Sequence, residues 1–140
     1  MTTVTQAVTL RCMINGHPVP VDYDVMFVYD PEVDPYAVTM AFLNTSTDTI
    51  TEWLISRDLL KAAVDARGFE KHGSGDVVAW TWPARVQILL RSPDGFLVTT
   101  IHRGLLRAFL QRTDGACKFG TESAHVDVDA FIHQIFEETA

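Results

Sequence analysis

The most regular pattern in this chain is the stretch VPVDYDVMFVY, residues 19–29. Apolar side chains occupy every second position from Val19 to Tyr29, opposite Asp22 and Asp24. Because successive side chains of a β-strand point to opposite faces, this alternation predicts a strand with one buried and one wet face. Half-buried strands of this kind are typical of antiparallel sheets. We therefore expect antiparallel β-structure around this segment.

Further strand patterns lie on both sides of this stretch, separated by turn sequences such as Asn15-Gly16-His17-Pro18 and Ser92-Pro93-Asp94-Gly95. Four strands precede any helical pattern. The other predicted strands are residues 8–14, 36–42, 50–55, 76–82, 85–92 and 95–102.

Three amphipathic helices are predicted among and after the strands. Ser56 is the expected N-cap of a helix over residues 57–67, which Gly68 ends. A second helix covers residues 103–113, and a third follows a capping Asp127 or Asp129. Together with the strands, these helices predict an α+β fold with two antiparallel β-sheets and three α-helices.

The first two predicted helices are also similar in sequence. RDLLKAAV at residues 57–64 aligns with RGLLRAFL at residues 103–110, an offset of 46 positions. This similarity suggests an internal repeat of strands followed by a helix. The alternative is that any two amphipathic helices share a double-leucine stripe.

Length and composition indicate one globular unit. A chain of 140 residues fits a single domain spanning residues 1–140, and 47% hydrophobic residues exclude a disordered tail. The net charge of −7 would repel a phosphate backbone unless the cations cluster. Cys12 and Cys117 form no CxxC pair and suit a reducing cytoplasm. With neither a secretory signal nor an apolar run of 18 residues, we expect a soluble intracellular protein.

No constellation of residues indicates catalysis, a cofactor or a metal, so we predict a protein that is not an enzyme. The five histidines form no HExxH motif, and Gly73-Ser74-Gly75-Asp76 lacks the lysine of a phosphate loop. The best metal candidate is His125 with Asp127 and Asp129, which share one side of an extended segment. The competing interpretation is that one of these aspartates caps the third helix.

Tryptophan and arginine side chains offer a different possibility. Together they could form a surface that stacks on the bases of single-stranded nucleic acid and neutralises its phosphates. Trp80 and Trp82 share a strand face and point outward if Val77 and Ala79 are buried, which would give a second packed layer or a protein-binding surface. The competing interpretation is that most tryptophans are core or interface residues. The residues considered for the stacking surface are Trp53, Trp80, Trp82, Arg57, Arg85, Arg91, Arg103 and Arg107.

Short motifs follow one another in a fixed order over residues 34–129. They are Asp34-Pro35-Tyr36-Ala37-Val38, Glu52-Trp53, Arg57-Asp58-Leu59-Leu60, Gly75-Asp76-Val77, Ser92-Pro93-Asp94-Gly95, Phe109-Leu110-x-Arg112-Thr113, Gly120-Thr121-Glu122 and Val126-Asp127-Val128-Asp129. Each motif is weak alone, but the ordered set resembles the SsgA-like proteins, the sporulation and cell-division regulators of actinomycete bacteria.

The resemblance implies a non-enzymatic adaptor that helps to localise the tubulin-like division protein FtsZ at septum sites in the cytoplasm. It further implies a trimeric homo-oligomer, other SsgA-like proteins as partners, and a fold similar to the whirly nucleic-acid-binding proteins. Because the surface charge is negative, we rank protein binding above the alternative, single-stranded nucleic-acid binding.

The matching positions divide into expected core and expected surface. Tyr36, Val38, Leu59, Leu60, Phe109 and Leu110 are predicted to be core. Asp58 and Arg112 have a second interpretation as helix caps or intrachain ion pairs, and Gly120 is expected to supply a backbone conformation or close approach. The candidate partner-binding residues are Arg57, Asp58, Trp80, Trp82, Arg112, Thr113, Gly120, Thr121 and Glu122.

Overall fold

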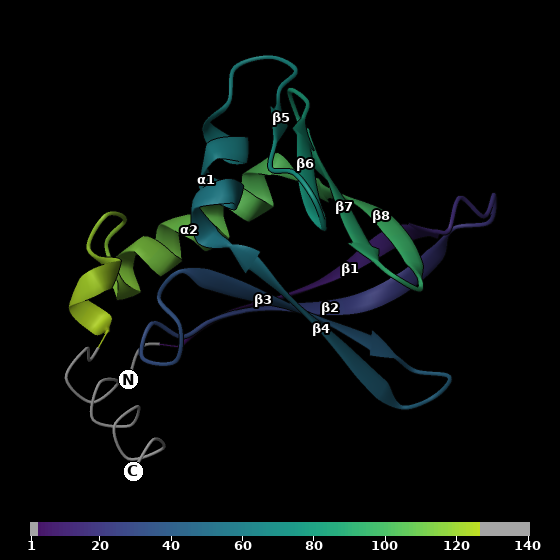
Figure 1. Cartoon of the computed structure of the whole chain (residues 1–140), viewed down its shortest axis with the longest axis horizontal. Coiled ribbons are helices and arrows are strands. Elements are labelled where there is room, and N and C mark those ends of the chain that lie inside the picture. The colour runs from purple at the N-terminus through teal and green to yellow at the C-terminus, as the bar shows by residue number, and fades with distance from the viewer. Residues whose placement is uncertain (1–2, 127–140) are drawn as a thin grey trace, which may run out of the picture.

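The eight strands of the described chain form one antiparallel sheet (Figure 1). The computed structural model describes residues 3–126. Across the sheet the strands lie in the order β4-β3-β2-β1-β8-β7-β6-β5. Their bounds are β1 Val4–Ile14, β2 Val21–Tyr29, β3 Ala37–Asn44, β4 Thr49–Ser56, β5 Lys71–His72, β6 Val77–Thr81, β7 Arg85–Ser92 and β8 Gly95–His102.

The prediction of two separate sheets is wrong, because β1 joins the two halves. One edge of β1 pairs with β2, and the end of β1 also pairs with β8, with Cys12 opposite Thr99. The strand ladder therefore continues from one half into the other. The described helices are α1 (Arg57–Asp65), α2 (Arg103–Ala116) and the short 3-10 helix η1 (Glu122–His125). The expected third α-helix lies outside the described residues.

Each half of the chain is a four-stranded antiparallel meander followed directly by a helix. The first half is β1 to β4 with α1, and the second is β5 to β8 with α2. This order agrees with the predicted strands-helix-strands-helix repeat. The aligned positions also agree in burial, because Leu60 of α1 and Leu106 of α2 are both fully buried.

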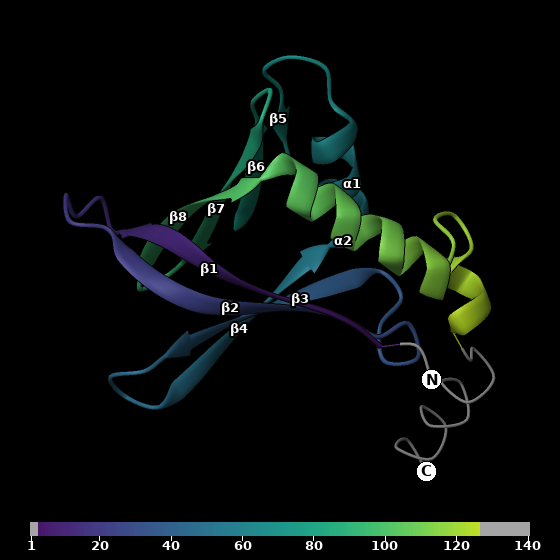
Figure 2. The same cartoon turned by 180° about the vertical axis from the view of Figure 1, so that it is seen from behind.

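The sheet curls around the two helices. α1 contacts β4 in the first half and β5 and β6 in the second, while α2 contacts β1, β7 and β8. Figures 1 and 2 show both helices on the same side of β1 to β4. The core lies between the helices and this side of the sheet, where Phe27 and Phe109 pack with ring centres 5.6 Å apart.

The core largely follows the predicted alternation. Val38, Leu60, Phe109 and Leu110 are buried as expected, and Leu59 is half-buried. Tyr36 is an exception. It is 50% exposed, because it precedes β3 in a turn where its N–H donates to Asp34 Oδ1 over 2.9 Å, so the strand alternation does not extend to it.

Local caps start both helices. Ser56 Oγ accepts a hydrogen bond from Leu59 N at 3.2 Å, which confirms the predicted N-cap of α1. His102 Nδ1 accepts one from Gly104 N at 3.1 Å at the start of α2. α1 ends at Asp65 rather than at residue 67, and Ala66 rather than Gly68 is its C-cap.

Candidate functional site

Arg57 is the centre of a buried polar cluster at the end of α2. Its Nη1 donates to the carbonyl of Cys117 at 2.7 Å and to that of Thr113 at 3.2 Å, and its Nη2 donates to Glu122 Oε1 at 2.7 Å. The guanidinium carbon lies 3.9 Å from the centre of the Phe119 ring. Arg57 is fully buried and Glu122 is 7% exposed. We call Arg57, Thr113, Cys117, Phe119 and Glu122 the arginine cluster.

The loop from α2 to η1 is shaped to bring Glu122 to Arg57. Gly120 has a φ of +90°, which favours glycine, and open space surrounds the position where its Cβ would stand. The glycine therefore supplies a backbone conformation, one of the two predicted reasons. Gly120 N donates to Glu122 Oε2 at 3.0 Å, and Thr121 Oγ1 donates to Lys118 O at 2.6 Å.

The pKa values of Glu122, in the arginine cluster, and of Tyr29, next to it, depart from their ordinary values. The hydrogen bond from Arg57 is the largest cause that lowers the pKa of Glu122 below its ordinary value of 4.5. Burial, followed by a hydrogen bond with the Cys117 sulfur, raises the pKa of Tyr29 above its usual range. Tyr29 thus stays protonated, and its hydroxyl donates a hydrogen bond to Pro35 O at 2.9 Å. The ionised Glu122 and Arg57 form a buried ion pair.

Burial contradicts the prediction that Arg57, Thr113 and Glu122 face a partner. They hold the end of α2 to the start of α1 instead. Arg112 is exposed, and its Nη2 donates to Thr5 O and Gln6 Oε1 in β1, both at 2.9 Å. These are intrachain hydrogen bonds, but neither the helix cap nor the ion pair that we considered as the alternative. The family motifs around α1 and α2 therefore mark structural contacts. Asp58, Gly120 and Thr121 are exposed, and a partner contact there stays a prediction.

An apolar face that sequence analysis missed lies on the outer side of β2 to β4. Both helices pack on the opposite side of these strands, and outward positions that alternation assigns to water carry Met26, Ala41, Leu43, Ile50 and Leu54. Ile50 and Leu54 are each 64% exposed. We call these five residues the apolar face. The signal that could have found them was apolar side chains at wet-face positions of alternating strands.

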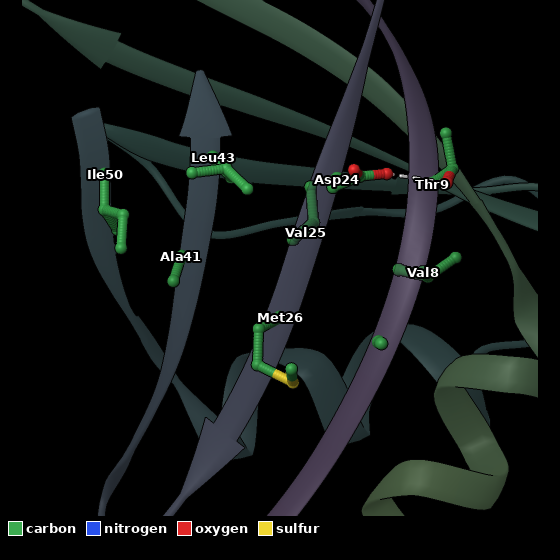
Figure 3. Close-up of a pocket in the computed structure, with 9 residues that line it drawn as sticks. Val8, Thr9, Asp24, Val25, Met26, Ala41, Leu43 and Ile50 are labelled. Carbon is green, nitrogen blue, oxygen red and sulfur yellow. Dashed lines mark hydrogen bonds between the residues drawn. The ribbon is translucent and has the colours of Figure 1, made fainter. Parts of the chain in front are cut away.

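A hollow of about 520 Å³ crosses the apolar face (Figure 3). Figure 3 shows Met26, Leu43 and Ile50 on three neighbouring strands, with Asp24 and Thr9 at one border. Thr9 Oγ1 donates to Asp24 Oδ1 at 3.0 Å. Large exposed apolar patches rimmed by polar groups are typical of protein contact surfaces.

The outer side of β5 to β8 carries aromatic and basic side chains. Ala79 is buried and Val77 half-buried, so Trp80 points outward, as the conditional prediction required. Trp80 is half-buried and Trp82 is 37% exposed. We call this surface the aromatic–cationic face, and its residues are Lys71, Trp80, Trp82, Arg85, Arg91 and Phe96.

The larger stacking surface considered for single-stranded nucleic acid does not assemble. Arg57 and Arg103 are buried between the helices, and Trp53 packs against the core from β4. Arg107 Nη2 donates to Val64 O at 2.7 Å on the helical side. Of the eight residues considered, those brought together on the aromatic–cationic face are Trp80, Trp82, Arg85 and Arg91.

Within residues 3–126, no group of three or more His, Cys, Asp or Glu side chains lies close enough to hold a metal ion. His125 is exposed in η1, and its predicted co-ligands Asp127 and Asp129 lie outside the described residues. In the same part of the chain, no helix combines the length and apolar character that spanning a membrane requires.

Comparisons with known proteins agree on one family. The family model described as Streptomyces sporulation and cell division protein, SsgA, matches residues 24–122. The sporulation-specific cell division protein SsgB of Streptomyces coelicolor is 36% identical over 148 aligned positions, covering 99% of this chain and 98% of the relative. SsgB of Frankia casuarinae is 35% identical over 134 residues, covering 91% and 87%.

A solved structure also matches. It comes from work on mutations in SsgB that correlate to longitudinal cell division during sporulation of Streptomyces coelicolor. The superposition has a TM-score of 0.76 at 32% sequence identity and covers 89% of this chain and 96% of that chain. The curled sheet with its two helices is therefore shared with a sporulation protein.

Proposed function

Because this chain belongs to the SsgA family of sporulation and cell division proteins, we propose that it is a non-enzymatic adaptor of septation that acts as a homo-oligomer. The family supports a role in cell division and sporulation. The finer role is to help localise FtsZ at septum sites in the cytoplasm, together with other SsgA-like proteins. A trimer and a likeness to whirly proteins are the assembly and fold that we expect.

The apolar face is the observation that supports the formation of an oligomer. Met26 is 40% exposed, and Ile50 and Leu54 are each 64% exposed, on strands whose other side is already filled by the core. Burying such side chains contributes about 25 cal/mol per Å² of apolar surface removed from water. β4 is an edge strand of the sheet formed by residues 3–126, and no described strand pairs with its outer edge. A second copy can approach the backbone groups along that edge. A second copy covering this face would leave the aromatic–cationic face free.

Solution mass and FtsZ binding test the two parts of the proposal separately. The chain should have the mass of an oligomer in solution, and Ile50→Asp/Leu54→Asp should reduce it to a monomer. Val33→Asp is the matched control, because Val33 is 82% exposed outside the apolar face. A wild-type monomer, or a double variant that keeps the oligomeric mass, would overturn the assembly part.

Co-sedimentation with FtsZ polymers at physiological salt tests the partner. We expect the oligomer to sediment with the polymers or to increase their amount. Repeated absence of both effects would contradict direct recruitment of FtsZ, whatever the oligomeric state.

A further inference from the structure

We infer that the aromatic–cationic face binds a short partner segment that combines carboxylates with large apolar side chains. This inference rests on the proposed role as a protein adaptor and names the chemistry of the segment that the adaptor recognises. The strands that carry the face are β5 to β8, on the side turned away from the core.

Cations and aromatic rings alternate across this face. The register places Lys71 opposite Trp80 and Arg91 opposite Phe96, so each pair shares one side of the sheet. The guanidinium carbon of Arg85 lies 5.8 Å from the centre of the Trp82 ring. Each basic group therefore stands beside a ring.

The three cations of the face have no acidic partner among residues 3–126. Lys71, Arg85 and Arg91 are exposed and take part in none of the ion pairs of the described chain, whereas Arg11, Arg57 and Lys61 are paired. In a chain of net charge −7, this is a local excess of positive charge. Such a patch complements carboxylates on a partner.

An apolar hollow lies between these cations. It has a volume of about 520 Å³ and is lined by Trp80, Gln87, Leu89, Arg91, Phe96 and Val98. Phe96 is 40% exposed at its border. Leucine or phenylalanine side chains of the partner segment would fill the hollow while neighbouring carboxylates reach the cations.

The same face is less suited to single-stranded nucleic acid. The Trp82 ring is contacted edge-on by Phe69 at 4.7 Å and faces Arg85, and Trp80 is half-buried. Base stacking needs free ring faces. A long polyanion would also meet the negative charge of the rest of the chain, whereas a short acidic segment meets the local cations.

Isothermal titration of the full chain with three synthetic twelve-residue peptides tests the inference. The first alternates Glu with Leu and Phe, the second has Gln in place of each Glu, and the third has Lys. We expect the Glu peptide to bind, the Gln peptide to bind at least about fivefold more weakly, and the Lys peptide not to bind. An oligo-dT of fifteen nucleotides is the nucleic-acid probe, and tighter binding of oligo-dT than of the Glu peptide would overturn the inference.

Charge-reversal variants locate the site. Arg85→Glu/Arg91→Glu should weaken binding of the Glu peptide by about tenfold or more. Lys118→Glu, at an exposed position just after α2, should leave this binding unchanged. Equal binding by both variants would overturn the location. If the double variant fails to fold, comparing the Glu and Gln peptides on the wild-type chain still tests whether carboxylates of the partner segment contribute to binding.

Comparing peptide binding with FtsZ co-sedimentation separates this inference from the proposed function. If the wild-type chain sediments with FtsZ but binds no Glu peptide, the inference fails and the adaptor role stands. If the Glu peptide binds at this face but FtsZ is not recruited, the role in recruiting FtsZ fails and the site remains.

Discussion

Arg57 and Arg103 occupy equivalent first positions of the two helices, and each donates hydrogen bonds to the terminal carbonyls of the other helix. Arg57 Nη1 reaches the carbonyls of Thr113 and Cys117 at the end of α2. Arg103 Nε donates to Val64 O at 3.0 Å, and its Nη2 donates to the carbonyl of Ala66. Each arginine therefore places its charge at the negative end of the other helix dipole.

This reciprocal capping explains two buried cations in a small core. Terminal carbonyls of a helix lack intrahelical partners, and a buried carbonyl without a partner costs free energy. The arginines satisfy those carbonyls and also fix the position of one helix against the other.

The first prediction concerns the buried ion pair. Glu122→Gln keeps the shape of the side chain but removes its charge, so it should lower the free energy of unfolding by about 2 kcal/mol. Urea unfolding measures the change. Glu32→Gln is the control, since Glu32 is exposed in the turn between β2 and β3, and this substitution should change stability by less than about 0.5 kcal/mol. Equal stability of both variants would show that the pair adds nothing.

The second prediction concerns how the stability contributed by Glu122 changes at acidic pH. The pKa of Glu122 is lower in the folded chain than its ordinary value of 4.5, so the unfolded chain binds more protons in the interval between the two values. The stabilisation is fully present above pH 4.5 and is lost as the pH falls through the lower, folded pKa. The stability difference between wild type and Glu122→Gln should therefore shrink below pH 4.5 in urea titrations. A difference that stays constant down to about pH 3 would contradict the depressed pKa of Glu122.

The third prediction concerns the other arginine. Arg103→Lys keeps the charge, but one ammonium group cannot reproduce bonds to the carbonyls of Val64, Ala66 and Trp82 at once. Thermal and urea unfolding should show that Arg103→Lys lowers the free energy of unfolding by about 2–3 kcal/mol. Arg85→Lys on the exposed aromatic–cationic face should be nearly neutral. If the two lysine variants unfold alike, Arg103 acts only through its charge.

The fourth prediction contrasts two glycines. Gly95 has a φ of +153°, and a Cβ there would collide with Asn15 Oδ1, which accepts from Phe96 N at 2.8 Å. Gly95→Ala should therefore destabilise the chain by about 1–3 kcal/mol. Gly115→Ala lies within α2 with open space around it and should stabilise by up to about 1 kcal/mol. In urea unfolding, the two substitutions should change the free energy of unfolding with opposite signs. Equal signs would contradict the placement of these two glycines.

Sequence patterns were informative where the signal is local. The alternation around Val25 and Phe27 and the cap at Ser56 predicted buried strand positions and a helix start that the structure confirms. Strand alternation depends on residues two apart, and an N-cap acts within one turn, so both can be read from a few neighbouring letters. Tyr36 was misplaced because a single hydrogen bond in a turn ends the alternation.

The site was harder to predict because residue type suggests exposure. Charged residues are almost never buried unless they are paired, so Arg57 and Glu122 were assigned to the surface. Their partners are each other, 65 positions apart in sequence. The apolar face differs, because its side chains stand at positions that strand alternation assigns to water. That alternation is a local signal, but whether another surface covers such a side chain depends on groups far away in sequence.

The amino-acid sequence by itself determined the described strands other than the short β5, the two inner helices, their repeat order and the family. Only the tertiary structure decided that β1 pairs with β8 to make one sheet, that two arginines lie buried, and that one outer face is apolar and another aromatic and basic. Local conformation follows from neighbouring side chains, whereas pairing and burial depend on groups far apart in the chain that meet only when it folds.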